Sequence, residues 1–126
     1  MDIKMVIFDT TVLIELYRGN QTVKDNIIAF GNGTYYISVI SVAEFLIGAR
    51  DKTDLIRLEK HISNYTPLAI NDHITKIFID HFKTFALSHR PGIADMLIAA
   101  TAIYYNLPVY TQNKKHFQFI PGLKLI

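Results

Sequence analysis

The feature that most constrains the fold of this chain is a short apolar run that ends on a single carboxylate. The run extends from Met5 to Phe8, Asp9 follows at once, and apolar residues then recur at helical spacing through Ile14. This pattern is typical of the first strand of a parallel α/β sheet and the helix after it. Asp9 would lie where the strand ends, which is where such sheets bind ligands. The alternative is that Asp9 or Thr10 only caps the helix.

Strand and helix patterns alternate along the rest of the sequence, with Gly, Asn, Asp and Pro near the boundaries. This alternation predicts a three-layer α/β/α fold around a central, mainly parallel sheet. No repeat or linker interrupts it, so we expect a single domain over residues 1–126. The expected strands are 5–8, 35–39, 67–70, 107–110 and 123–126, and the expected helices are 12–17, 21–30, 41–49, 51–63, 72–88 and 93–105.

The composition limits the classes of protein. Half of the residues are hydrophobic, which is enough for a sizeable core. The absence of cysteine excludes disulfides and thiolate metal sites and fits a cytoplasmic protein. No apolar run reaches the ~18 residues of a membrane span, and the first residues lack a signal-peptide pattern. A formal net charge of +2 permits an anionic partner but does not argue for one.

Three acidic residues lie in apolar surroundings: Asp9, Glu44 and Asp95. Each is near the end of an expected strand or the start of the following helix, and in a parallel sheet these positions converge on one edge. A charge buried without a partner costs several kcal/mol, so such groups usually pair or bind a metal. Converging carboxylates raise each other's pKa, and a divalent cation relieves the repulsion. Oxygen ligands alone favour Mg²⁺ or Mn²⁺ over zinc.

Each acid also has a purely structural interpretation. Ser41 and Glu44 have the spacing of a capping box, in which the carboxylate reaches back to the helix start. Asp95 lies in the first turns of its helix, where a negative charge suits the helix dipole. If all three acids were caps, the chain would be a structural α/β module without a site.

Four segments, in order along almost the whole chain, resemble the PIN-domain nucleases and, within them, the VapC-type toxins of toxin–antitoxin pairs. They read Phe-Asp-Thr-Thr-Val-Leu-Ile at 8–14, Ser-Val-Ala-Glu-Phe-Leu-Ile-Gly at 41–48, Ile-Ala-Asp-Met-Leu-Ile-Ala-Ala-Thr-Ala at 93–102 and Thr-Gln-Asn-Lys-Lys-His-Phe at 111–117. The resemblance implies a PIN-like fold, a metal-dependent endoribonuclease that uses Mg²⁺ or Mn²⁺, a homodimer, an RNA substrate and a cognate antitoxin protein as partner.

The resemblance also implies roles for single residues. Asp9, Glu44 and Asp95 match the family's acidic metal-binding and catalytic positions. Thr11 matches a small polar position where Asn or Ser is more usual, and its hydroxyl would orient Asp9 or a metal-bound water. Asn113 matches a position that is often Asp, and no acid follows Asp95 to restore a fourth carboxylate. The substitution lowers the negative charge of the site and predicts weaker metal binding.

The remaining expected roles concern the substrate. Thr111 and Asn113 would hydrogen-bond the site water or the phosphate. Lys114 and Lys115 would steer the RNA backbone, because the segment after Asp95 carries only basic charges. Arg50, which lies earlier in the chain, would assist them.

Other functions remain open at this point. A phosphatase with an aspartate nucleophile would carry a second Asp where Thr11 stands. No H-E-x-x-H or Gly-rich phosphate loop occurs, which argues against a zinc hydrolase or a nucleotide-binding loop. A catalytically weak PIN-like domain that binds RNA or protein without cleaving it is favoured by Asn113 and opposed by the three acids.

Overall fold

Four short strands form an entirely parallel sheet at the centre of the protein, in the order β3-β2-β1-β4. The fold is described from a computed structural model that covers residues 5–31 and 33–126, so residues 1–4 and 32 of the predicted domain lie outside the description. The strands are β1 (Met5–Phe8), β2 (Thr34–Ser38), β3 (Thr66–Leu68) and β4 (Val109–Tyr110). The parallel sheet predicted from the alternating pattern is confirmed.

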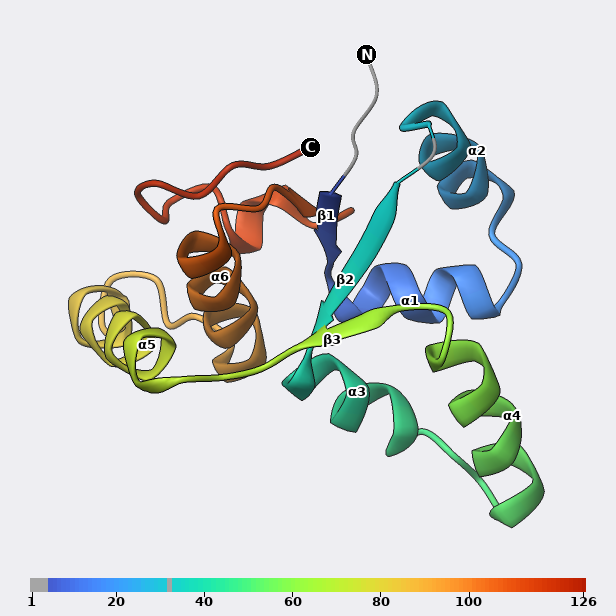
Figure 1. The fold of residues 1–126 in the computed structure, drawn as a ribbon. Coiled ribbons are helices and arrows are strands. Elements are labelled where there is room, and N and C mark those ends of the chain that lie inside the picture. Colours follow the sequence, from blue (N-terminus) through green and yellow to red (C-terminus); the bar gives the residue numbers. More distant parts are fainter. Residues whose placement is uncertain (1–4, 32) are drawn as a thin grey trace.

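Six α-helices connect and cover these strands (Figure 1). The layers follow from the alternation of side chains along β1. Val6 and Phe8 pack into one core cluster with α1 to α4, whereas Ile7 packs into a second cluster with α5, α6 and the C-terminal segment. The helices are α1 (Thr10–Tyr17), α2 (Gln21–Ala29), α3 (Val39–Leu46), α4 (Lys52–Ile62), α5 (Asp72–Phe85) and α6 (Ile93–Tyr105), and a 3₁₀ turn, η1, spans Lys114–His116.

Helix α6 is the central helix that its apolar sequence predicts. Met96, Ile98 and Ala99 are buried in the second core cluster. Only the ends of the helix reach the surface, where Ile93 and Tyr104 are exposed. Because the middle of the helix packs into the core, the first turn of α6, which contains Asp95, has a fixed position relative to the sheet.

Several boundaries differ from the sequence-based prediction. The third strand begins at Thr66 and ends at Leu68 rather than Ile70. The predicted last strand is reduced to one bridge between Leu125 and Val109. Asn71, not Asp72, caps α5, because the Asn71 side chain accepts the Ile74 N–H. These shifts lie at element ends and leave the order of the elements unchanged.

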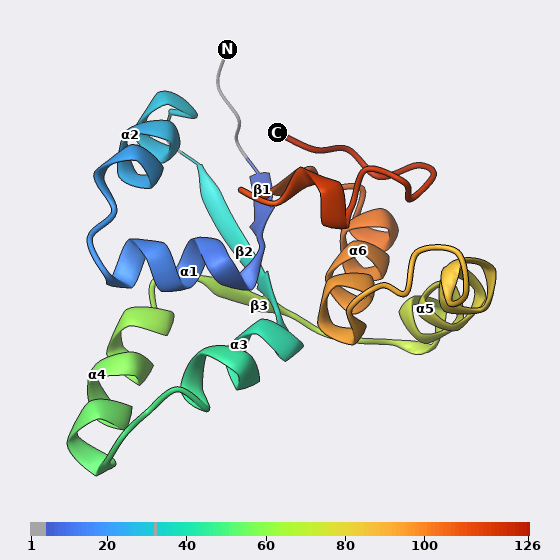
Figure 2. The same ribbon diagram turned by 180° about the vertical axis from the view of Figure 1, so that it is seen from behind.

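The register of the sheet places three strand ends side by side. Phe8 of β1 pairs with Ile37 of β2 and with Tyr110 of β4. The first turns of α1, α3 and α6 lie near this same end of the sheet (Figure 2). In residues 5–31 and 33–126, none of the helices has the length and apolar character that crossing a membrane requires.

Candidate active site

Asp9 is the most firmly held acidic residue at this end of the sheet. It follows β1 and is the N-cap residue of α1, but its side chain accepts no capping hydrogen bond. Its Oδ2 instead accepts hydrogen bonds from the hydroxyls of Thr11, at 2.9 Å, and Thr111, at 2.8 Å. Asp9 is only 3% exposed. The capping interpretation of its carboxylate is therefore wrong.

Thr111 connects Asp9 to the far end of the chain. It follows β4, is 2% exposed, and its Oγ1 accepts the Asn113 backbone N–H at 2.9 Å. Both threonine hydroxyls bind Oδ2 of Asp9, so Oδ1 is left without a hydrogen bond among the described residues. Every fully buried side-chain oxygen or nitrogen in that part of the chain has a partner. Oδ1 of Asp9 therefore reaches the surface, where it can bind a ligand.

Glu44 is held by a neighbouring helix rather than by its own. Helix α3 begins after Ser38, whose side chain accepts the Ile40 N–H, so the predicted capping box at Ser41 is wrong. Oε1 of Glu44 lies 2.7 Å from the Thr10 hydroxyl, which is also 2.9 Å from the Ser41 hydroxyl. Since Thr10 has one proton and an ionised carboxylate can only accept, Thr10 donates to Glu44.

The environment of Glu44 also differs from the sequence-based expectation. The apolar residues around it in the sequence suggested a buried charge, but the residue is exposed. The apolar neighbours are divided between core and surface: Phe45 is buried in the first core cluster, whereas Val39 is 45% exposed and Ile47 is 86% exposed. Glu44 is therefore a surface carboxylate with one hydrogen-bond partner, free to change rotamer.

Asp95 lies in the first turn of α6, and its side chain is 23% exposed. Its pKa is raised, first by burial and then by the negative charge of Asp9, with a smaller contribution from Glu44. His116 opposes this increase: its Nδ1 lies 3.2 Å from Oδ2 of Asp95. The predicted repulsion among converging carboxylates is thus present at Asp95.

His116 is the site residue that the sequence analysis missed. It was considered only as part of a basic C-terminal segment, because no sequence spacing links it to Asp95. The contact arises because η1 brings the end of the 111–116 segment against the first turn of α6. The only available signal was that His116 lies within the fourth family-like segment.

The three acids provide the oxygen donors that a hard divalent cation prefers. In residues 5–31 and 33–126, however, no three acidic or histidine side chains stand close enough to form a ready metal cluster. Asp95 is turned to His116 and Glu44 to Thr10. The donor chemistry and the accessible Oδ1 of Asp9 fit such an ion, while the carboxylates of Asp95 and Glu44 are engaged with neighbouring residues.

The predicted basic residues lie in different surroundings. Lys114 and Lys115 are exposed on η1, beside the acids. Arg50 lies at the start of α4, where its Nε is 3.5 Å from Oδ2 of Asp54 and its backbone N–H donates to the same oxygen. Asp54 is buried, and its pKa is lowered chiefly because of this backbone hydrogen bond.

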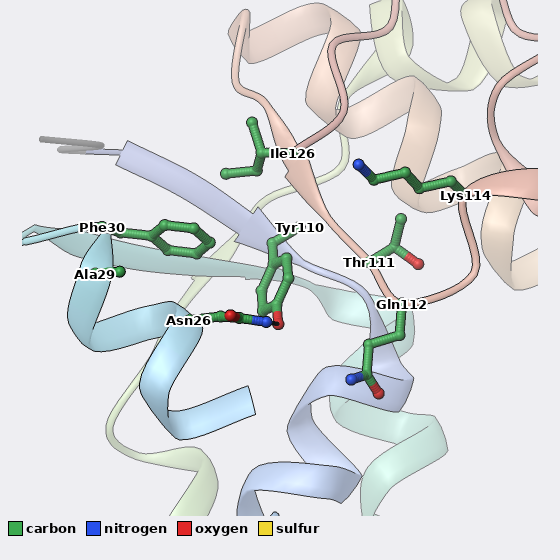
Figure 3. A pocket seen from close by; sticks show the side chains of 8 residues that line it. All are labelled: Asn26, Ala29, Phe30, Tyr110, Thr111, Gln112, Lys114 and Ile126. Carbon is green, nitrogen blue, oxygen red and sulfur yellow. Dashed lines mark hydrogen bonds between the residues drawn. The ribbon is translucent and has the colours of Figure 1, made fainter. Parts of the chain in front are cut away.

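Among the cavities that border the 111–116 segment, two lie toward different helices. One, of about 420 Å³, lies between α2 and the end of β4 (Figure 3). Lys114 and Gln112 line it together with Phe30, and Asn26 donates a hydrogen bond to the Tyr110 hydroxyl. The other, of about 360 Å³, lies on the α6 side and includes Asp95. Asp95 therefore borders a hollow large enough for part of a polymer chain, and Glu44 borders another one, on the side of α1 and α4.

The structure has acidic side chains at the carboxyl ends of parallel strands, an arrangement that suits the binding of a cation. A comparison with known protein families agrees with this kind of site. The PIN domain family model matches residues 6–121. The chain belongs to the PIN domain family, as the four sequence segments indicated.

Two named relatives indicate which group within this family the chain resembles. The chain is 33% identical to "Ribonuclease VapC" of Rickettsia bellii over 96% of this chain and 94% of that protein. It is 32% identical to "Ribonuclease VapC10" of Mycobacterium tuberculosis over 95% and 91% of the two chains.

Solved structures agree with the fold. VapBC-1 from nontypeable Haemophilus influenzae superimposes with a TM-score of 0.82 at 26% identity, covering 97% and 96% of the two chains. A toxin-antitoxin complex from Klebsiella pneumoniae gives 0.79 at 27% identity, covering 96% and 95%. The predicted three-layer, PIN-like architecture is confirmed.

Proposed function

We propose that this protein is a metal-dependent endoribonuclease and the toxin of a type II toxin–antitoxin pair, acting on RNA in the cytoplasm. The observation that carries the proposal is the anchored carboxylate of Asp9, with one oxygen fixed by Thr11 and Thr111 and the other accessible. The relatives named ribonuclease VapC support the same chemistry.

In this proposal Asp9 and Asp95 would hold Mg²⁺ or Mn²⁺ directly, and Glu44 would hold it directly or through water. When bound, the ion would polarise the scissile phosphate and lower the pKa of a water. Hydrolysis would form one P–O bond to the water oxygen and break the P–O bond to the leaving ribose oxygen, and the proton released by the water would pass to that ribose oxygen.

The chain's other residues act around this centre. Thr11 and Thr111 hold Asp9 so that its free oxygen faces the substrate. The exposed Asn113 side chain hydrogen-bonds a water or a phosphate oxygen. Lys114 and Lys115 attract the RNA backbone from the two sides of the 111–116 segment, because each lines a different flanking cavity. Arg50 contributes more weakly, because Asp54 already balances its charge.

A solved relative suggests the protein partner. The Klebsiella pneumoniae structure is a toxin-antitoxin complex. We therefore propose a cognate antitoxin that covers the site. The resemblance to the VapC-type toxins also leads us to propose a homodimer as the active form.

The alternative is a PIN-like domain that binds RNA or protein and cleaves neither. It is favoured by Asn113 in place of an acid and by the lack of a ready metal cluster among residues 5–31 and 33–126. It differs from the ribonuclease in one measurable respect, which is metal-dependent turnover.

The experiment is cleavage of a total-RNA pool by the purified protein with Mg²⁺, with Mn²⁺ and with EDTA, beside an Asp9→Asn variant. We expect discrete fragments that require metal and disappear in the variant. Intact RNA with a folded protein in both metals supports the binding module. Fragments that persist in EDTA and in the variant contradict the proposed chemistry.

A further inference from the structure

The cavity on the α6 side has a composition suited to a nucleotide. Its volume of about 360 Å³ lies within the range of small-molecule sites, ~300–1,000 Å³. Arg90, Lys115, His89 and His116 line it, and Asp95 is the only acidic residue that does so. The cavity therefore adjoins the proposed active site through Asp95. Its lining is mainly positive, whereas the active site is negative.

Part of its wall is an aromatic platform. The His89 ring stacks on Phe119, with ring centroids 4.2 Å apart and planes 16° apart. Phe119 is in turn packed edge-on against Phe85 at 5.0 Å. The exposed His89 imidazole is also held by a 2.8 Å contact between its Nδ1 and the Ser88 hydroxyl. A ring fixed in this way offers a flat surface on which a base can stack.

Arg90 occupies a backbone conformation that does not suit arginine. Its φ is +44°, and Pro91 follows it. The only other non-glycine residue with positive φ among residues 5–31 and 33–126 is Asn106, a residue type that favours this conformation at a helix end. Glycine or asparagine at position 90 would relieve the strain. Strain of this kind is concentrated at functional sites.

The two full positive charges that line the cavity, those of Arg90 and Lys115, are also available to bind a ligand. Three ion pairs occur in the part of the chain that the structure describes, and neither Arg90 nor Lys115 takes part in any of them. An arginine presents a planar fork of donors that matches a phosphate group. An aromatic platform beside two unpaired cations matches a base and its phosphate better than it matches an acidic peptide, which has no ring to stack.

We propose that this cavity is a subsite for one nucleotide of single-stranded RNA adjoining the cleavage point, with its base stacked on His89 and its phosphate bound by Arg90 and Lys115. The subsite rests on the proposed function for its substrate, and it would help to determine which sequences the protein selects. Binding can be measured without cleavage, so the two proposals can fail separately.

The test is fluorescence anisotropy of a labelled single-stranded RNA of mixed sequence with the full chain in EDTA, over a series of salt concentrations. Arg90→Gly should raise the melting temperature, because it removes backbone strain, yet raise Kd about tenfold. It should also reduce the salt slope by about 0.7, the loss of one phosphate contact. Arg90→Lys should keep the salt slope. Lys76→Ala is the control, since it removes an exposed charge of α5 outside the cavity.

His89→Ala separates base stacking from charge. It should raise Kd about fivefold or more on normal RNA and have no effect on an abasic oligonucleotide of the same length. Equal affinity of wild type, Arg90→Gly and His89→Ala for RNA overturns the subsite while leaving the ribonuclease proposal intact. Failure of the folded wild type to bind RNA overturns the subsite, whereas the metal-dependent cleavage of the RNA pool decides the ribonuclease proposal separately. Binding of polyglutamate with the same dependence on Arg90 overturns the assignment of a nucleotide.

Discussion

Asp9 and Glu44 lie at the same end of the sheet but are supported very differently. Asp9 is buried, and its two hydroxyl donors come from adjacent α1 and from the end of β4, 102 residues away. Glu44 is exposed and has one donor, Thr10. The difference indicates that Asp9 is a preorganised anchor for a cation, whereas Glu44 is a ligand that must turn to join it.

The largest expected effect is on catalysis at the anchor. Asp9→Asn should lower the RNA cleavage rate on the order of 1,000-fold, because it removes several kcal/mol of metal-mediated transition-state stabilisation. Glu44→Gln should lower it less, by about 10- to 100-fold, because Glu44 is the more weakly held ligand. Single-turnover rates on one mapped RNA substrate would measure both. Equal losses of cleavage rate in the two variants would contradict the distinction between an anchor at Asp9 and a mobile ligand at Glu44.

Support of the anchor can be removed without touching the carboxylate. Thr111→Val deletes a buried hydroxyl, leaving Asp9 with one donor and the Asn113 N–H without its acceptor. We expect a loss of about 1–3 kcal/mol in the free energy of unfolding. Urea denaturation measures this loss, and an unchanged midpoint would show that the hydroxyl chain contributes nothing to stability.

The matched change at the mobile ligand is Glu44→Ala, which removes the exposed carboxylate and leaves the buried Thr10 and Ser41 hydroxyls bonded to each other. We expect a cost of about 0.5 kcal/mol in the same denaturation experiment, well below that of Thr111→Val. A cost as large as that of Thr111→Val would mean that the Thr10–Glu44 contact is as structural as the one at Asp9.

The smallest expected effect is a pH dependence of the free energy of unfolding that arises from a histidine of α4. His61 packs against Phe45 and Tyr17, and burial lowers its pKa below 6.5. The unfolded chain therefore binds the proton more readily, and stability should fall as pH decreases through 6.5 and level off below the lowered pKa of the folded protein. His61→Phe should flatten the curve of melting temperature against pH over this interval, and an unaltered slope would assign the titration to another group.

The comparison of Asp9 with Glu44 also shows what sequence can and cannot predict. Asp9 was recognised because an apolar strand and a helical pattern fix the end of β1, and strand ends in parallel sheets converge. The Ser41 capping box failed because Ser38, three residues earlier, already provides the helix start. A short-range pattern could not decide between two serines that both precede helical spacing.

The features of the site that the sequence could not predict arise from contacts between distant segments of the chain. Nothing in the spacing of His116 and Asp95 predicts that η1 will meet the first turn of α6. No local pattern predicts that Asp54 is buried and accepts the Arg50 backbone N–H. Thr111 was expected to contact water or phosphate, but its hydroxyl donates to Asp9. The sequence determines which groups are present, whereas tertiary packing decides which of them meet.

Mn²⁺ binding, measured by isothermal titration calorimetry without RNA, tests the role of Asp9 most directly. The account predicts that the wild type binds Mn²⁺, that Thr111→Val binds it about 10- to 100-fold more weakly, and that Asp9→Asn shows no binding at the same concentrations. Wild-type affinity in a folded Asp9→Asn variant would contradict the claim that Asp9 anchors the cation.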